Sequence, residues 1–309
     1  MTWTPRRTAY LLLALTALFW SGNVVLGRAL ANELPPLALT FWRWLLALAI
    51  LWPFARAGLK GKGALIRREW KSLALFALLG ISGFNALAYI AFQTTTAINA
   101  ALINTAMPVT VVVIAWAGWR QVISARQGLG IAVSLAGTAA ILARGDISVL
   151  LTLDVTRGDL WMATGVVAYA FYSVLLRTRP PGLDGVAFLT VVSAFGTLQL
   201  IPLVIAETIL VGPLPLTAAS LGMVAYVAIF PAVLGYVFWN RGVAVVGPAR
   251  SAMFLHLMPV FTAALAIGFL GEALRPYHGL GMALVFGGLL LVVQVRPVAP
   301  IGSRLASPR

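Results

Sequence analysis

The chain has 309 residues, of which 61% are hydrophobic and 10% are charged. Because a soluble chain carries roughly 25% charged residues, this composition excludes a water-facing surface over most of the protein and predicts that the lipid bilayer is its solvent. The net charge of +14 would suggest a nucleic-acid partner in a soluble protein. In a membrane protein it indicates basic loops on one side of the bilayer and no nucleic-acid partner.

The sequence contains no cysteine, which excludes disulfides, thiolate nucleophiles and cysteine-ligated metals. At the N-terminus, Arg6 and Arg7 precede an apolar run that begins at Tyr10, as they would in a signal peptide. The run continues directly into Trp20 and Asn23 without a convincing small-residue cleavage site. We therefore expect this segment to be kept as the first membrane span.

Apolar segments long enough to cross a bilayer follow one another along the chain. A transmembrane helix needs about 20 mostly apolar residues, and ten such segments fit the sequence. We expect spans at residues 9–28, 36–55, 72–92, 96–119, 127–144, 158–177, 186–206, 217–240, 247–271 and 276–295. The sequence therefore predicts an all-α membrane protein with ten transmembrane helices.

Lysine and arginine residues are divided unevenly between the two sides that this plan creates. If the N-terminus is cytoplasmic, 17 of them fall inside, and four fall outside, namely Arg28, Arg144, Arg157 and Arg275. Basic residues concentrate in the cytoplasmic loops of membrane proteins. We therefore expect cytoplasmic N- and C-termini in a multi-pass protein of the bacterial inner (plasma) membrane.

An internal repeat relates the two halves of the chain. Met107-Pro108-Val109 returns 151 residues later as Met258-Pro259-Val260, and at the same offset Gly137 falls on Gly288. Such self-similarity indicates two copies of one structural unit. We place the first five-helix repeat at 1–144, an outside linker at 145–157, the second repeat at 158–295 and a cytoplasmic tail at 296–309.

Five spans per repeat is an odd number, so the second copy must enter the membrane upside down relative to the first. Inverted repeats are a feature of secondary transporters, whose substrate site lies near the midplane between the repeats. Small residues such as Gly137, Gly281 and Gly288 allow close helix packing, and we interpret these glycines as packing residues.

Four motifs resemble those of one family of membrane proteins: FWSGN at 19–23, FWRW at 41–44, the repeated MPV, and GEALRPYHGLGMALVFGGLLLV at 271–292. In these features the chain resembles the EamA family of the drug/metabolite transporter superfamily, and within it the amino-acid exporters of the aromatic amino-acid exporter YddG type. The resemblance implies ten helices in two inverted five-helix repeats and movement of small metabolites by alternating access. The first copy departs from the pattern, because Gln121 stands where the second has Glu272.

No Asp or Glu falls in the middle of a predicted span. Intramembrane carboxylates are the usual proton relays and cation sites, so their absence favours a facilitative carrier. Obligatory proton coupling would have to depend on His256, in the ninth span, or on a terminal acid such as Glu207. His256 titrates near neutrality when unperturbed, but a neutral side chain that is hydrogen-bonded to a neighbouring helix is the favoured interpretation.

Arg43 is the one cation inside a predicted span. A charge at the bilayer centre costs at least about 2.5 kcal/mol, so the residue needs an explanation. One interpretation is an anchor for the carboxylate of a substrate, because a guanidinium binds a carboxylate through two parallel hydrogen bonds. The other is a structural arginine that binds helix-end carbonyls.

Neutral polar and aromatic side chains recur in equivalent spans of both halves. Such groups can bind the amino and carboxyl groups of a zwitterion without a large desolvation cost, although each one alone can also serve helix packing. Together with Arg43 and His256, the candidate substrate-binding residues are Trp20, Asn23, Asn85, Tyr89, Asn104, Tyr169, Ser173, Tyr236 and Asn240.

Pro108 and Pro259 occupy matching places in the two copies. Each removes a backbone donor and opens the helical hydrogen-bond ladder upstream, which produces either a static kink or a hinge. Our hypothesis is a pair of matched hinges about which the protein rocks.

The sequence thus favours a transporter that moves amino acids or similar small metabolites, mainly outward, without a cofactor. A proton-coupled drug/metabolite antiporter is the alternative. An intramembrane enzyme would need clustered catalytic groups, and two histidines, no cysteine and no mid-span acid argue against catalytic or metal-ligating residues. The inverted repeat argues against a passive scaffold, and the lack of a continuous polar helix face argues against a channel. Because an inverted pair is closed in itself, a monomer suffices.

Overall fold

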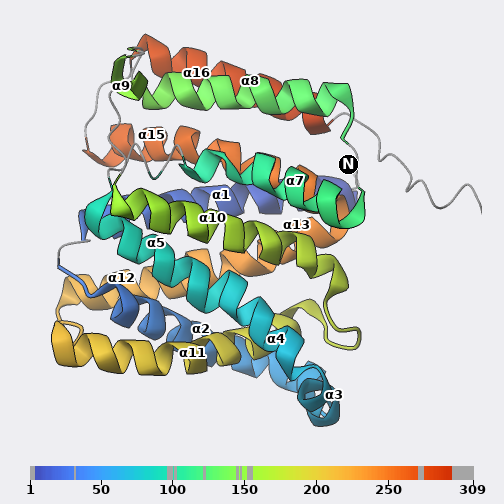
Figure 1. Ribbon diagram of the computed structural model, residues 1–309, viewed down its shortest axis with the longest axis vertical. Coiled ribbons are helices and arrows are strands. Elements are labelled where there is room, and N and C mark those ends of the chain that lie inside the picture. The colour runs from blue at the N-terminus through green and yellow to red at the C-terminus, as the bar shows by residue number, and fades with distance from the viewer. Residues whose placement is uncertain are drawn as a thin grey trace, which may run out of the picture.

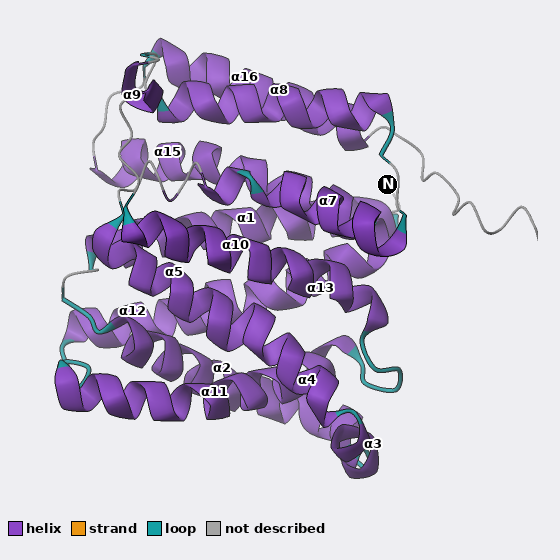
Figure 2. Cartoon of the chain, in the orientation of Figure 1, coloured by secondary structure: helices purple, strands orange, loops and turns teal. Residues whose placement is uncertain are grey.

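The computed structural model describes residues 4–30, 33–95, 100, 103–120, 123–143, 146, 148–151, 156–270 and 275–293. Within these residues the secondary structure is helical and contains no strand (Figure 2). The predictions that concern Gln121, Glu272 and the 296–309 tail lie outside the described residues.

The first half of the chain forms a series of helices that begins with α1. Its elements are α1 (Pro5–Ala29), α2 (Pro36–Leu59), α3 (Gly63–Arg68), α4 (Trp70–Ala77), the π-helix η1 (Leu78–Ser82), α5 (Gly83–Thr94), α7 (Met107–Trp119), α8 (Ala125–Leu142) and α9 (Ser148–Leu151). Helices α4 and α5 continue one another through η1, so the predicted third span is one rod with a π-helical turn inside it.

The second half follows a similar plan. Its elements are α10 (Arg157–Leu175), the 3₁₀ turn η2 (Leu176–Thr178), α11 (Gly185–Leu210), α12 (Ala218–Val227), the π-helix η3 (Ala228–Leu234), α13 (Gly235–Val246), α14 (Pro248–Met253), the 3₁₀ turn η4 (Phe254–His256), α15 (Leu257–Leu270) and α16 (Pro276–Val293). Like η1, the segment η3 interrupts a long rod, so the described residues of each half include one π-helical turn.

Six helical rods in the described residues are long and apolar enough to cross a membrane, at 5–27, 36–59, 70–94, 157–178, 185–210 and 218–246. Shorter apolar helices lie at 103–119 and 279–292. The six rods match the predicted spans one, two, three, six, seven and eight. The total of ten spans stays a prediction, as do the repeat boundaries.

Helix pairing follows the same scheme in both halves. Helix α1 packs against α13 and α15, while α10, its predicted counterpart, packs against α5 and α7. The remaining large contacts join counterparts directly: α2 lies along α11, and α8 lies along α16 at the opposite edge of the molecule (Figure 1). This pattern of contacts is the one that the predicted repeat would produce.

Glycines let α8 and α16 approach backbone to backbone. A Cβ atom added to Gly137 would lie 2.7 Å from the carbonyl oxygen of Gly281, and one added to Gly130 would lie 2.7 Å from that of Gly288. Real Cβ atoms do not come so close to a backbone oxygen, so these positions need glycine. The predicted packing role of Gly137, Gly281 and Gly288 is confirmed.

Carboxylates stabilise several helix N-termini. Glu207, at the end of α11, accepts hydrogen bonds from the amides of Leu37 (3.0 Å) and Ala38 (2.6 Å) in the first turn of α2. A negative charge at the N-terminus of a helix also interacts favourably with the positive end of the helix dipole. Glu207 therefore has a structural partner, which accounts for a buried acid without proton transport.

Candidate functional site

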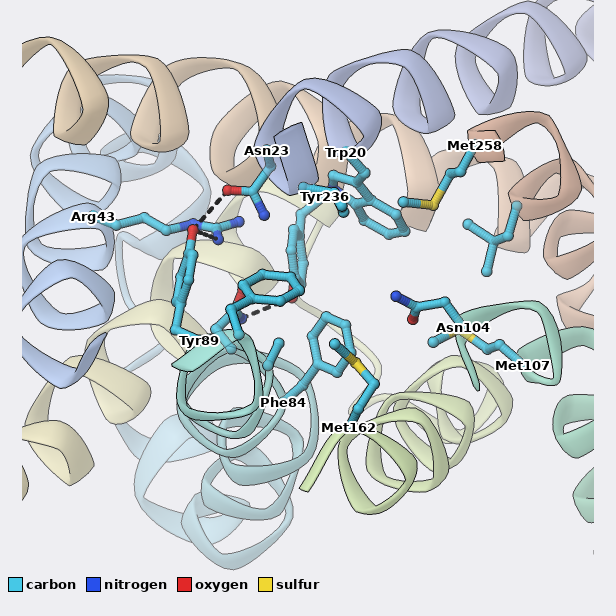
Figure 3. Close-up of a pocket in the computed structure, with 15 residues that line it drawn as sticks. Trp20, Asn23, Arg43, Phe84, Tyr89, Asn104, Met107, Met162, Tyr236 and Met258 are labelled. Carbon is cyan, nitrogen blue, oxygen red and sulfur yellow. Dashed lines mark hydrogen bonds between the residues drawn. The ribbon is translucent and has the colours of Figure 1, made fainter. Parts of the chain in front are cut away.

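A cavity lies among helices from both halves of the chain (Figure 3). Its volume is about 50 Å³, several times the roughly 10–15 Å³ that one water molecule needs. Helices α1, α2, α5, α7, α10, α13 and α15 contribute to its walls. The lining residues are Trp20, Asn23, Val24, Arg43, Phe84, Asn85, Ala88, Tyr89, Phe92, Asn104, Met107, Met162, Tyr236, Leu255 and Met258.

Arg43 supplies the positive charge at one end of the cavity. Its side chain is only 1% exposed, and its Nη1 donates a hydrogen bond to the hydroxyl of Tyr89 at 3.1 Å. That hydroxyl in turn donates to Oδ1 of Asn23 at 2.6 Å, so three helices are joined at this end (Figure 3). The guanidinium also lies 5.4 Å from the ring of Trp44, within the range of a cation–π interaction.

No carboxylate forms a salt bridge with Arg43 in the described part of the chain, where the one salt bridge joins Arg68 and Glu69. Moreover, Nε of Arg43 has no hydrogen-bond partner among these residues. The partner observed for the guanidinium is thus a tyrosine hydroxyl, and not the helix-end carbonyls that a purely structural role was expected to involve. A buried cation of this kind can accept an anionic group that enters the cavity.

Asn85 and Tyr236 form part of the wall by binding the π-helical turn η1. Nδ2 of Asn85 donates to the carbonyls of Gly80 (3.3 Å) and Ile81 (2.8 Å), and the hydroxyl of Tyr236 also donates to Gly80. On the other side, Nε1 of Trp20 donates to the carbonyl of Pro231 in η3 at 3.0 Å. A π-helical turn leaves carbonyls without their usual helical partner, and these side chains provide replacements.

Opposite Arg43 the cavity is mostly apolar. Met107, Met162 and Met258 lie around this end, and Asn104 extends into the open space beside them (Figure 3). Methionine side chains adapt to irregular shapes and make favourable contacts with aromatic rings. Sequence analysis did not select these methionines, although Met107 and Met258 begin the two matched Met-Pro-Val motifs and offered a signal.

The structure brings seven of the eleven predicted binding residues to this cavity: Trp20, Asn23, Arg43, Asn85, Tyr89, Asn104 and Tyr236. The other four are not among its lining residues. Tyr169, Ser173 and Asn240 are buried behind the wall formed by Trp20 and Tyr236. His256 is fully buried. It is the last residue of η4 and follows Leu255, which lines the cavity.

The two predicted hinge prolines occupy the first turn of a helix and not its interior. Pro108 is the second residue of α7, directly after a turn at Ala106, and Pro259 is the third residue of α15, directly after η4. Proline is well tolerated in a first helical turn, because the amide hydrogen it lacks has no helical partner there. The helix is therefore already interrupted upstream of each proline.

The cavity has the chemical character of a binding site for a small molecule. It combines a buried cation, amides, hydroxyls, aromatic rings and flexible apolar side chains, which together suit a molecule with a carboxylate at one end and an apolar part at the other. In the described residues, no group of three or more His, Asp or Glu side chains could hold a metal ion.

Several long apolar helices around a cavity that holds a buried cation are typical of a multi-pass membrane protein. The profile of the EamA-like transporter family matches residues 7–143 and again residues 156–294. The chain belongs to the EamA-like transporter family, and it is therefore a membrane transporter of the drug/metabolite transporter superfamily.

Relatives agree with this assignment over most of their length. An uncharacterized transporter of Archaeoglobus fulgidus is 30% identical over 91% of this chain and 96% of its own. The uncharacterized transporter YyaM of Bacillus subtilis is 27% identical over 91% and 92%. A probable terminal-alkyne amino-acid exporter of Streptantibioticus cattleyicolor is 27% identical over 73% of each chain. A solved crystal structure that is 21% identical covers 98% of this chain with a TM-score of 0.73, which supports the fold.

Proposed function

We propose that this transporter moves amino acids or similar small metabolites across the bacterial inner membrane, mainly outward, by facilitative alternating access. The observation that carries the proposal is the buried guanidinium of Arg43, which faces the cavity without a carboxylate partner among the described residues. Burial of a charge costs several kcal/mol unless it is paired. A solute carboxylate would supply the missing partner each time a solute binds.

The rest of the cavity suits the remainder of an amino acid. The amide oxygen of Asn23, at the Arg43 end, can accept a hydrogen bond from an ammonium group, and the ring of Trp20 offers it a π face. The methionine-lined end can receive an apolar side chain. One of the relatives is named as a probable exporter of an amino acid, which supports the same solute class.

Charge supports the proposed orientation, and a relative supports the proposed direction. The bias of 17 basic residues against four favours cytoplasmic termini. The relative named as a probable exporter supports outward movement. Since the cavity draws its walls from both halves of a single chain, one copy suffices for transport, and we propose a monomer.

Efflux from liposomes tests this function. Purified protein is placed in liposomes loaded with common amino acids, and the efflux of each is followed with and without an imposed pH gradient. We expect a subset of amino acids with apolar side chains to leave without the gradient. Failure of every amino acid to leave under either condition would reject the proposal.

Arg43 variants then test the carboxylate anchor. Loss of a hydrogen-bonded charged partner costs about 1.5–3 kcal/mol, so we expect Arg43→Gln to lower phenylalanine uptake at limiting concentration about 10- to 150-fold. Uptake of phenethylamine, which lacks the carboxylate, should not fall. Arg56→Gln, an exposed position of the same helix α2, is the matched control. Equal phenylalanine uptake by Arg43→Gln and Arg56→Gln would contradict the anchor.

A proton-coupled drug/metabolite antiporter is the second candidate, and His256 is the observation that favours it. The imidazole is fully buried, and neither ring nitrogen has a hydrogen-bond partner in the described part of the protein. Its neighbours Leu255 and Met258 line the cavity. Efflux that requires the pH gradient in the natural protein and loses this requirement in His256→Gln would favour the antiporter.

A further inference from the structure

A second group of polar side chains lies buried behind the cavity wall. The hydroxyl of Tyr169, Oγ of Ser173 and Nδ2 of Asn240 have no hydrogen-bond partner among the described residues, although all three side chains are at most 5% exposed. We refer to these three residues as the inner polar cluster. A buried polar group without a partner costs roughly 1–3 kcal/mol, so three of them together need an explanation.

The members of the inner polar cluster belong to two facing helices. Ser173 lies one turn beyond Tyr169 on α10, so the two side chains share a face of that helix. Asn240 lies on α13, and its Oδ1 accepts a hydrogen bond from the hydroxyl of Tyr172 at 3.0 Å. The Tyr172 ring lies 5.3 Å from that of Tyr169, which joins the two sides of the cluster.

Aromatic rings separate the cluster from the cavity. The rings of Tyr169 and Trp20 meet edge to face at 5.5 Å, and those of Tyr169 and Tyr236 do so at 5.9 Å. Trp20 and Tyr236 line the cavity, whereas Tyr169 does not. Trp20 and Tyr236, which we call the aromatic layer, thus have the cavity on one side and the inner polar cluster on the other.

The cavity and the cluster also lie toward opposite ends of the helices. Asn23 is six residues from the end of α1, while Ser173 is two residues from the end of α10. Figure 1 shows that α10 and α13 run toward the end of the bundle at which α1 begins. The cluster therefore lies toward the N-terminal end of the bundle, and the charged end of the cavity lies toward the other.

We propose that the inner polar cluster is the second half of the solute path, closed in this conformation by the aromatic layer. In the opposite conformation, Tyr169, Ser173 and Asn240 would face water and the polar groups of the passing solute. Their hydrogen-bonding groups would then be satisfied, which explains why a transporter keeps them. The inference rests on the alternating access proposed above but not on the solute class, and it holds for any small polar solute that the protein carries.

Because the natural sequence has no cysteine, single cysteines can test sided access directly. Asn23→Cys reports on the cavity, and Ser173→Cys and Asn240→Cys report independently on the cluster. Each variant is treated with a membrane-impermeant thiol reagent in spheroplasts and in inverted vesicles, which expose opposite faces of the membrane. Thr138→Cys on α8 is the matched control, because Thr138 is fully buried and its Oγ1 also has no partner among the described residues.

We expect Asn23→Cys to react from one face, and Ser173→Cys and Asn240→Cys to react from the other. A transported solute should change the two reaction rates in opposite directions, by about fivefold or more. Three results would overturn the proposal: no reaction of either cluster variant while Asn23→Cys reacts, reaction of all three from the same face, or equally fast reaction of Thr138→Cys. Sided access needs no solute, so a failed amino-acid assay would leave this result standing.

Discussion

The α8–α16 contact and the cavity region differ in how they use space. In the α8–α16 contact, small residues bring two backbones together, and Oγ of Ser134 donates to the carbonyl of Val285 at 3.3 Å. In the cavity region, large aromatic and amide side chains hold helices apart and leave an open volume with a buried cation. Tight backbone packing resists displacement, whereas side chains can exchange partners when helices move. We therefore expect α8 and α16 to form a fixed support during the proposed cycle, and α1, α5, α10 and α13 to surround the part that changes.

The largest loss of stability is expected at the glycine contacts between α8 and α16. We expect Gly281→Ala to lower the free energy of unfolding by about 1–3 kcal/mol, because the new methyl group would collide with Ile141 and the Gly137 carbonyl. Gly287→Ala is the matched control on the same helix, since nothing lies within 4 Å of its Cβ position. Denaturant unfolding in detergent micelles measures both. Equal stability of the two variants would contradict the fixed support.

In the cavity region, hydrogen bonds to η1 should be shared between side chains. Tyr236→Phe removes one donor to the Gly80 carbonyl, but Asn85 remains, so we expect a loss of about 1 kcal/mol in unfolding free energy. Asn85→Leu alone should cost a similar amount. The double variant should cost more than the two single losses combined, because Gly80 then has no side-chain donor. Strict additivity would show that the two side chains act separately.

A Glu207 variant tests whether this buried acid takes part in proton transfer. If its carboxylate only caps α2, Glu207→Gln should lower the unfolding free energy by about 0.3–1 kcal/mol through the lost helix-dipole interaction. The pH dependence of solute efflux should stay that of the natural protein. A changed pH profile with unchanged stability would instead place Glu207 in proton transfer.

The smallest effect is expected at the hinge prolines. Pro108→Ala and Pro259→Ala should each slow efflux about threefold, equivalent to less than 1 kcal/mol, because the helices are already interrupted upstream of each residue. Pro53→Ala, inside α2 and outside the cavity lining, is the control. Natural efflux rates in both hinge variants would reject the hinge hypothesis.

Much of this plan could be predicted from the sequence, because lipid imposes simple rules. Long apolar runs predicted the six rods that the structure contains. Polar side chains are costly in an apolar span, which drew attention to Asn23, Arg43 and Tyr89, and all three line the cavity. The methionines at the cavity were missed because hydropathy does not distinguish them from other apolar side chains, and only the repeated Met-Pro-Val motif marked Met107 and Met258. Their position depends on how helices from different parts of the chain meet.

Helix rotation limited the remaining site predictions. Tyr169 and Trp20 look alike in the sequence, yet one is behind the cavity wall and the other in it. The π-helical turns η1 and η3 add a second limit for Asn85 and Tyr236, which follow them in the same rods, because an extra residue in a turn rotates everything that follows. Composition and hydropathy do not distinguish a π-helical turn from an α-helical one, so the faces presented to the cavity become visible only in the structure.

Under the alternating access proposed above, the charge on Arg43 would also link this transporter to the membrane potential. In an alternating-access cycle, the empty protein exposes this cation first to one side of the membrane and then to the other. A full unit charge that crosses 100 mV changes in energy by about 2.3 kcal/mol, and a cation that crosses part of the field experiences part of that energy. A zwitterionic solute carries no net charge, so voltage would act on the return of the empty protein and set how quickly it becomes ready for the next solute.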